Sequence, residues 1–132
     1  MKKQRKAYIS GPMRSKPDLN YPAFDSAAAE LRKAGWIVYN PAEMDRNEDG
    51  IDWSKQGFTI EEQKELAAKY SRRFAWRDLK LLVRKMKAEN GDAVVLLDDW
   101  EESVGANAER AVGMWVGLKI MTFKEALADE ED

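Results

Sequence analysis

The sequence predicts an α/β fold in which helices cover both faces of a parallel sheet. Apolar runs of strand length alternate with amphipathic helical patterns along the 132 residues. The first three elements follow one another at the spacing of a βαβ unit, and the run A-V-V-L-L at residues 93–97 has the composition of a fully buried strand. We therefore expect a flavodoxin-like or Rossmann-like three-layer sandwich of four to five parallel strands, built as a single domain over residues 1–132.

In the N-terminal half, the expected elements are a strand over residues 7–10, a helix over 20–35, a strand over 36–39 and a loop over 42–58. The helix has Asn20 and Pro22 at its start and Gly35 at its end, which are favoured residues at these positions. Its apolar residues share one face, at positions 24, 27, 28 and 31. This stripe predicts the side of the helix that packs on the sheet.

In the C-terminal half, the expected elements are a helix over residues 59–90, a strand over 93–97, a loop over 98–105, a helix that ends at 117 and a strand over 120–123. Thr59 and Glu62 form a capping box at the start of the first helix. Apolar stripes are expected at positions 79, 82, 83 and 86, and at 108, 111, 112 and 115. A basic tail over residues 1–6 and an acidic tail over 124–132 flank the folded part, and the acidic tail is expected to fray.

Charge and missing residue types exclude several classes of function. Lys and Arg total 22 against 24 acidic residues, and this balance does not favour a nucleic-acid polymer as partner. Without cysteine or histidine, the chain cannot form disulfides, thiolate or imidazole metal sites, or triads that use histidine. Acid–base chemistry therefore falls to carboxylates, Lys or Tyr, and we expect no metal and no cofactor. No apolar run approaches the length of a membrane span, so we expect a cytoplasmic protein without membrane contact.

The start of the helix after the 93–97 strand is the first candidate site. Ligands of open parallel sheets bind beyond the carboxyl ends of strands, and free N–H groups at a helix start attract anions. Gly105 lets the backbone approach a ligand closely, and Ser103 adds a hydroxyl donor. Glu109 is expected within the first turn, where the helix dipole favours its ionised form. A capping Ser, a turn Gly and a dipole-complementing Glu would give the same pattern without a ligand.

Asp78 is the second candidate, because helix geometry lifts it to the same edge of the sheet. Residues 78–89 of a helix span about 17 Å, which is close to the length of a five-residue strand. Helix and strand run antiparallel around Gly91, so Asp78 is expected level with Glu109 on the rim of one pocket. A surface aspartate paired with Arg77 or Lys80 would also fit the pattern. The stretch Y-I-S-G-P-M supplies a third wall with Tyr8, Ser10, Gly11, Pro12 and Met13.

Four motifs occur in order along the chain: Y-I-S-G-P-M, N-P, R-D-L and S-V-G-A-N-A-E. Together they resemble the nucleoside 2-deoxyribosyltransferase-like superfamily, including a small branch often encoded by phages, over roughly residues 7–122. The resemblance implies that Glu109 is a nucleophile that attacks the anomeric carbon and holds the sugar covalently. It implies that Asp78 protonates the departing base or activates the incoming group, and that residues 10–13 hold sugar and base. Retaining glycosyl transfer likewise needs two close carboxylates.

One departure from the transferases proper bears on the substrate. Six residues before the nucleophile they carry an Asp that binds the free 5′-hydroxyl of a nucleoside, whereas this chain carries Ser103. The related deoxynucleoside 5′-monophosphate N-glycosidases carry Ser there, because a hydroxyl donates to a phosphate that a carboxylate would repel. The resemblance therefore implies cleavage of the N-glycosidic bond of a (deoxy)nucleoside 5′-monophosphate, with Ser103, Gly105 and Ala106 around the phosphate.

Three alternatives stay open. The first is a deoxyribosyltransferase that exchanges bases, the second a non-catalytic nucleotide-binding module, and the third a glycohydrolase of NAD-type dinucleotides. The resemblance also implies a homodimer or higher homo-oligomer, since one subunit of this superfamily often completes its neighbour's pocket. The helical overhang over residues 59–77 is expected to project past the sheet edge as a lid or a dimer contact.

Overall fold

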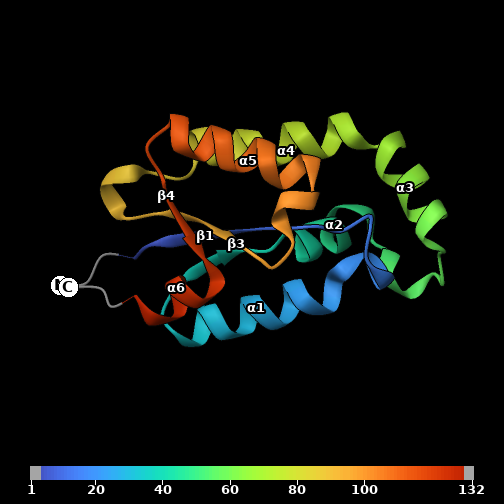
Figure 1. Ribbon diagram of the computed structural model, residues 1–132, viewed down its shortest axis with the longest axis horizontal. Helices are drawn as coiled ribbons and strands as arrows, with labels where there is room; N and C mark the ends of the chain where they lie inside the picture. The colour runs from blue at the N-terminus through green and yellow to red at the C-terminus, as the bar shows by residue number, and fades with distance from the viewer. Residues whose placement is uncertain (1–3, 130–132) are drawn as a thin grey trace.

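A parallel sheet of four strands lies in the middle of the computed structural model, which describes residues 4–129 (Figure 1). The strand order is β2–β1–β3–β4. The strands are β1 (Lys6–Ser10), β2 (Ile37–Tyr39), β3 (Ala93–Leu96) and β4 (Lys119–Thr122). Residues 1–3 and 130–132 of the two expected tails lie outside the described residues. Helices cover both faces of the sheet, which confirms the predicted three-layer α/β sandwich.

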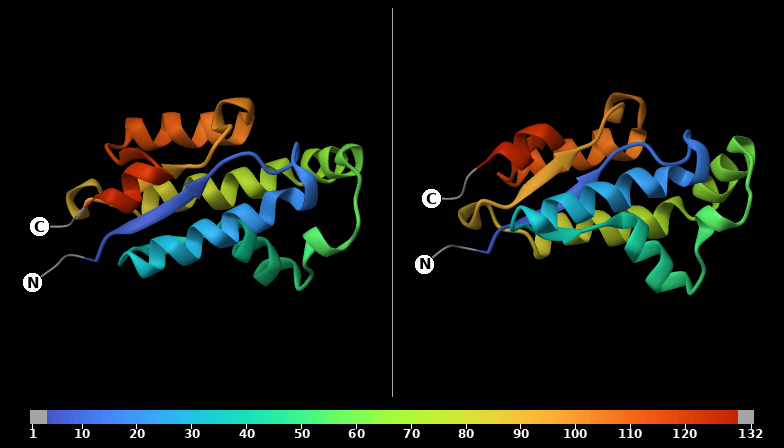
Figure 2. Two further views of the ribbon diagram at one scale, coloured as in Figure 1. Left: turned by 60° about the horizontal axis from the view of Figure 1, so that its bottom comes forward. Right: turned by 90° about the horizontal axis from the view of Figure 1, so that it is seen from below.

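Helices on opposite faces of the sheet form the outer layers (Figures 1 and 2). One face carries α1 (Tyr21–Lys33) and α6 (Phe123–Ala128), and the other carries α4 (Ser71–Arg84) and α5 (Val104–Trp115). Beyond the carboxyl ends of the strands lie α2 (Pro41–Asp49) and α3 (Ile60–Lys69). Short 3₁₀ turns are η1 (Pro17–Asn20), η2 (Trp53–Lys55), η3 (Ala88–Asn90) and η4 (Trp100–Glu102). Among the described residues, no helix is long and apolar enough to cross a membrane.

The core has two halves, separated by the alternation of side chains along the strands. Ala7 and Ile9 of β1 pack in the half beneath α1, together with the predicted stripe of that helix, which is buried as expected. Tyr8 of β1 packs in the other half, with Leu82 of α4. Because strand side chains alternate, Ser10 points to the same face as Tyr8. The face toward α4 and α5 therefore receives two hydroxyl-bearing side chains from one strand.

The predicted loop over residues 42–58 is wrong for its first half, where α2 forms. The Asn40 side chain caps this helix by accepting a hydrogen bond from the Ala42 amide at 3.0 Å, and Pro41 takes the first helical position. Gly50, with a left-handed φ of 66°, ends it. The signals for a short helix were thus present in a segment whose polar composition favoured a loop.

The single helix predicted over residues 59–90 is two helices joined at Tyr70, and the second ends at Arg84. The apolar faces of the two helices pack against different halves of the core. Leu66 of α3 packs against the core half beneath α1, whereas Leu82 of α4 belongs to the half on the other side of the sheet. One straight helix cannot reach both, so the chain changes direction at Tyr70, where φ is −109° and ψ is 13°.

The predicted apolar stripe of α5 is wrong at three of its four positions, whereas Val112 packs against the core as expected. Helix α5 packs on the sheet through Ala106 and Gly113, which are buried, while Ala108 and Ala111 are exposed and Trp115 is 88% exposed. A glycine facing the sheet lets the helix lie close to the strands. The other three residues of the predicted stripe lie at the surface of the helix. On α4, Val83 departs from its predicted stripe in the same way and is 56% exposed.

The predicted tails are structured where they are described. Arg5 stacks on the Trp36 ring at 3.8 Å and is ion-paired with Asp129, which ties the two ends of the described chain together. The expected fraying from residue 124 is wrong up to residue 129, because α6 buries Ala126 completely. The Trp36 indole also donates to the Ala126 carbonyl, at 3.2 Å. These contacts close the side of the sheet that carries α1.

Candidate active site

The carboxylate of Glu109 lies at the centre of the candidate site. It is carried by α5, and its two oxygens accept hydrogen bonds from two hydroxyl groups of β1. Tyr8 donates to Oε2 at 2.7 Å, and Ser10 donates to Oε1 at 2.7 Å. Both oxygens are thus held by neighbours on one face of a buried strand. The contact joins residues that are about a hundred positions apart in the chain.

A glycine allows α5 to come close enough for this contact. Gly113 follows Glu109 by one turn, and a Cβ atom placed there would lie 2.7 Å from Cγ2 of Val94 on β3. Val94 is completely buried in the core, so it has little room to move aside. The small residue at position 113 therefore sets the distance between helix and sheet at which Glu109 meets Tyr8 and Ser10.

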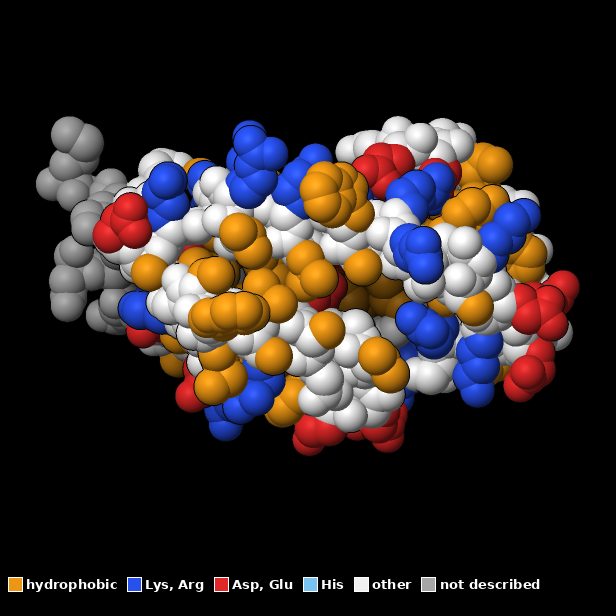
Figure 3. Space-filling view, turned by 90° about the horizontal axis from the view of Figure 1, so that it is seen from above, with side chains coloured by type: hydrophobic (Ala, Val, Ile, Leu, Met, Phe, Trp, Pro, Cys, Tyr) orange, Lys and Arg blue, Asp and Glu red, His pale blue; other side chains and the backbone are white. Residues whose placement is uncertain are grey.

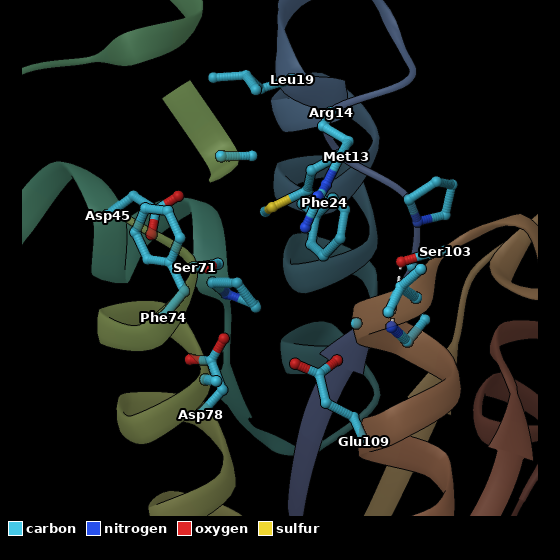
Figure 4. Close-up of a pocket in the computed structure, with 18 of the residues that line it drawn as sticks. Met13, Arg14, Leu19, Phe24, Asp45, Ser71, Phe74, Asp78, Ser103 and Glu109 are labelled. Atoms are coloured by element: carbon cyan, nitrogen blue, oxygen red, sulfur yellow. Dashed lines mark hydrogen bonds between the residues drawn. The ribbon is translucent and has the colours of Figure 1, made fainter. Parts of the chain in front are cut away.

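The second carboxylate, Asp78, faces Glu109 from α4 (Figure 4). It is buried and paired with its neighbour Arg77, whose Nε donates to Oδ1 at 2.7 Å. Arg77 Nη1 also donates to Asp45 of α2, at 2.7 Å, and the Tyr21 hydroxyl donates to the other Asp45 oxygen at 2.6 Å. The pairing of Asp78 with Arg77 is therefore present, but it belongs to a buried network and not to a solvated helix surface.

Burial and mutual repulsion shift the proton affinities of these groups. Burial raises the pKa of Glu109 to about 7, and the negative charge of Asp78 adds to the rise. Burial also raises the pKa of Asp78, against the opposing hydrogen bond and charge of Arg77. The pKa of Tyr8 lies well above its ordinary value because of burial and the Glu109 charge, so its hydroxyl remains a donor. At neutral pH the site therefore holds a carboxyl group poised between its two protonation states.

The two carboxylates line the inner end of a cavity of about 500 Å³, a size typical of small-molecule sites. Its opening is a hollow in the face that carries α4 and α5 (Figure 3). The apolar part of the wall includes Met13, Leu19, Phe24, Trp53, Leu66 and Phe74. Arg14 and Lys64 also line the cavity, and Figure 4 shows the Arg14 side chain extending into it. The cavity thus joins an acidic inner end to an aromatic chamber with cationic groups.

Nine of the ten predicted site residues line this one cavity: Tyr8, Gly11, Pro12, Met13, Asp78, Ser103, Gly105, Ala106 and Glu109. Ser10, the tenth, is not part of the lining and acts on the site by holding Glu109. The residues come from β1, α4 and α5 and the loops beside them, which are distant in sequence. The common site expected at the carboxyl ends of the strands is therefore present as geometry.

Several details of that expectation need correction. Glu109 is the sixth residue of α5 and lies beyond its first turn, so burial, and not the helix dipole, decides its ionisation. Gly11 makes room mainly for a core side chain, because a Cβ atom at this position would lie 3.0 Å from Cβ of Leu97. Ser103 is the N-cap of α5 and accepts a hydrogen bond from the Ala106 amide at 3.1 Å. The capping role is therefore established, and it leaves the hydroxyl proton of Ser103 free to donate.

The sequence analysis missed the aromatic chamber and the Asp45–Arg77 pair. The spacing of Phe24 predicts only a core residue of the helix that contains it, although both Phe24 and Phe74 line the cavity. The sequence does not reveal Asp45, because the segment around it has the polar composition of a loop; the helix that begins at Pro41 turns Asp45 toward Tyr21. Within residues 4–129, no group of three or more acidic side chains is arranged to hold a metal ion.

The family model described as "Domain of unknown function (DUF4406)" matches residues 5–122, and the chain belongs to this family. No curated protein matches the chain. The family description names no activity, so the roles implied by the superfamily resemblance stay predictions.

Replacing Gly113 by alanine tests whether close packing of α5 positions the site. We expect Gly113→Ala to lower the free energy of unfolding by about 1–3 kcal/mol, because the added methyl group overlaps Val94. Urea unfolding followed by fluorescence measures the change. Gly105→Ala is the control, since its only neighbour within 4 Å would be Ser103 Oγ at 3.9 Å, and it should leave stability nearly unchanged. Equal stability of both variants would contradict the packing argument.

The raised pKa of Glu109 predicts a pH-dependent cost of folding. A carboxyl group whose pKa is about 7 when folded, and ordinary when unfolded, stabilises the fold below pH 4.5 and loses that effect as the pH rises through 7. Relative to Glu109→Gln, which does not ionise, the wild-type protein should lose about 1–3 kcal/mol of unfolding free energy between pH 5 and pH 8. Urea titrations at both pH values measure this. Glu65→Gln, on the exposed side of α3, should behave as wild type, and an identical pH response of all three proteins would refute the assignment.

Proposed function

We propose that this member of the DUF4406 family hydrolyses the N-glycosidic bond of a (deoxy)nucleoside 5′-monophosphate, with Glu109 as nucleophile. The observation that carries the proposal is the Glu109 carboxylate itself, oriented by Tyr8 and Ser10 and facing a second buried carboxyl group across a ligand-sized cavity. Two opposed carboxyl groups supply both a nucleophile and an acid–base group. The resemblance of the motifs to the 2-deoxyribosyltransferase-like superfamily supports the same roles.

In the first step, an ionised Glu109 oxygen attacks C1′ of the sugar while the bond from C1′ to the base nitrogen breaks. Asp78 gives a proton to the departing base, since burial and the negative charge of the ionised Glu109 both favour the protonated form of its carboxyl group. In the second step, water attacks C1′, the ester bond to Glu109 breaks, and the water proton returns to Asp78. The hydroxyl donors Tyr8 and Ser10 stabilise Glu109 as a leaving carboxylate in this step.

The rest of the cavity supports a nucleotide ligand. The Ser103 hydroxyl proton and the N–H groups of Val104 and Gly105, which have no intrahelical acceptor in the first turn of α5, can donate to a 5′-phosphate. Phe24 and Phe74 offer apolar faces for a base. A serine at position 103 brings no negative charge near the phosphate, which favours a monophosphate over a free nucleoside.

A second copy of the chain is the proposed partner, and it would cover the face of α4 and α5. Trp76 is 69% exposed on α4 and Trp115 is 88% exposed on α5, and these two helices lie side by side on one face of the sheet (Figure 1). A groove on α4 is lined in part by Trp76 and Val83, and the exposed Trp115 belongs to the neighbouring helix α5. A surface that offers both a knob and a groove is suited to a two-fold interface. The same helices border the cavity, so a second copy would narrow its opening.

Base release from a panel of nucleotides tests the activity. Wild type should release the base from at least one (deoxy)nucleoside 5′-monophosphate, and Glu109→Ala should reduce the rate at least about a thousandfold, as removal of a nucleophile does. Chromatography of the free base measures release. Glu101→Ala, an exposed acidic residue just before α5, is the control and should retain the wild-type rate.

The same panel separates the alternatives. Release from free nucleosides only when an acceptor base is present would favour a deoxyribosyltransferase and refute the argument from Ser103. Release of nicotinamide from NAD would favour a dinucleotide glycohydrolase. Nucleotide binding without any release, with affinity unchanged in Glu109→Ala, would favour a binding module and contradict the proposal.

Sedimentation velocity tests the two-fold interface. Wild type should sediment as a dimer, and Trp115→Asp should shift it to the monomer because a charge replaces the exposed indole. Ile51→Asp, a comparable exposed apolar position outside this face, is the control and should remain dimeric. A wild type that stays monomeric at every concentration would rule out the interface.

A further inference from the structure

The loop over the cavity, residues 13–20, has an unusual backbone conformation. Its last three residues, Asp18, Leu19 and Asn20, have φ angles of 54°, 55° and 58°. Left-handed angles are unfavourable for residues other than glycine, and three in succession persist only when the surroundings hold them. We call residues 13–20 the cavity loop, because four of them line the cavity: Met13, Arg14, Ser15 and Leu19.

The side chain of Gln63, on α3, holds the cavity loop. It is only 1% exposed and makes three hydrogen bonds, all to loop backbone. Its amide nitrogen donates to the carbonyl oxygens of Arg14, at 3.2 Å, and Lys16, at 2.6 Å. Its carbonyl oxygen accepts from the Leu19 amide at 3.1 Å. Both donor hydrogens and the acceptor of one buried carboxamide are therefore used to fasten the loop.

The other ties to the cavity loop are weaker or local. Lys16 pairs with Asp99 at 2.7 Å, but both side chains are substantially exposed, and such ion pairs contribute little. The Asn20 side chain donates to the carbonyl oxygen of Pro12 at 2.9 Å, which closes the loop on itself and does not attach it to α3. The buried amide of Gln63 is thus the main polar connection between the cavity loop and the helix beyond the sheet.

We infer that Gln63 is a positioning residue that holds the cavity loop closed over a bound nucleotide and so sets substrate affinity without taking part in the chemistry. The inference rests on the proposed function. Gln63 does not line the cavity, and it lies on α3, whereas the reacting carboxylates Glu109 and Asp78 lie on α5 and α4. Leu66 and Lys64, its neighbours on α3, do line the cavity. We call the three hydrogen bonds of Gln63 to the cavity loop the latch. Loss of the latch would therefore loosen the two parts of the cavity wall formed by the cavity loop and by α3, and would leave the acidic inner end in place.

Only a carboxamide of this length satisfies all three partners. A glutamate would direct an anionic oxygen at two carbonyl oxygens, and an asparagine is one methylene group too short. Methionine has a side chain of similar length that is apolar, so it forms none of the three hydrogen bonds. Gln63→Met therefore removes the latch with little change in volume, and Glu65→Met, on the exposed side of the same helix, is its control.

Two measurements on Gln63→Met test the inference. Hydrogen exchange of the unliganded protein should accelerate at least about tenfold at the Leu19 amide, which loses its acceptor. With a nucleoside monophosphate that wild type hydrolyses, KM should rise at least about tenfold while kcat changes less than about twofold. Glu65→Met should match wild type in both. A fall in kcat with unchanged KM, or unchanged exchange at Leu19, would overturn the inference.

A second variant acts in the opposite direction and does not disturb Gln63. Asp18→Gly removes the strain of a left-handed conformation at an exposed position and so stabilises the observed conformation of the cavity loop. Hydrogen exchange at the Leu19 amide should therefore slow, and KM should fall. If Gln63→Met fails to fold, this variant decides the question, and unchanged exchange in it would overturn the inference. If wild type hydrolyses no nucleotide, the proposed function fails, and hydrogen exchange alone then decides whether Gln63 latches the loop.

Discussion

The two hydrogen bonds that Tyr8 and Ser10 give to the Glu109 carboxylate impose a constraint on the whole sandwich. They require α5 to lie close against the sheet, with one of its turns directly over the end of β1. They also require two successive inward positions of β1 to carry hydroxyl groups where apolar residues would normally fill the core. Gly113 meets the first requirement, because even the Cβ atom of an alanine there would lie 2.7 Å from Cγ2 of Val94. The position of the candidate nucleophile is thus a property of the packing, and not of a flexible loop.

This arrangement lowers the stability of the fold at neutral pH. A carboxyl group with a pKa of about 7 lowers the free energy of unfolding at neutral pH, because its ionised form is disfavoured in the folded protein. The nearby charge of Asp78 adds to this cost. The Arg77 network offsets the cost, since its guanidinium pairs with Asp78 and with Asp45 at once. Such pairs of carboxyl groups with perturbed proton affinity are typical of catalytic sites. The surrounding helices α2 and α4 therefore serve the electrostatics of the cavity as much as the core.

The sheet and α1 could be predicted because their signals are local: apolar runs for β1 and β3, and a 3.6-residue period for α1. Glu109 and Asp78 could be brought together from helix and strand lengths alone. The orientation of α5 could not, because Gly113 packs inward while Ala111 and Trp115 are exposed, and periodicity cannot tell a core stripe from an exposed one. The role of Gln63 could not be predicted either, since its side chain forms hydrogen bonds with backbone atoms of a loop that is distant in sequence. The sequence pattern does not predict the conformation of that loop.

Mass spectrometry of the protein quenched during turnover of a (deoxy)nucleoside 5′-monophosphate tests the central claim most directly. Nucleophilic attack by Glu109 leaves the sugar phosphate attached as an ester, so the tryptic peptide over residues 88–110 should carry that added mass, located at Glu109 by fragmentation. The Glu109→Ala protein should carry none. Turnover with no adduct on this peptide, or an adduct at another residue, would contradict the account.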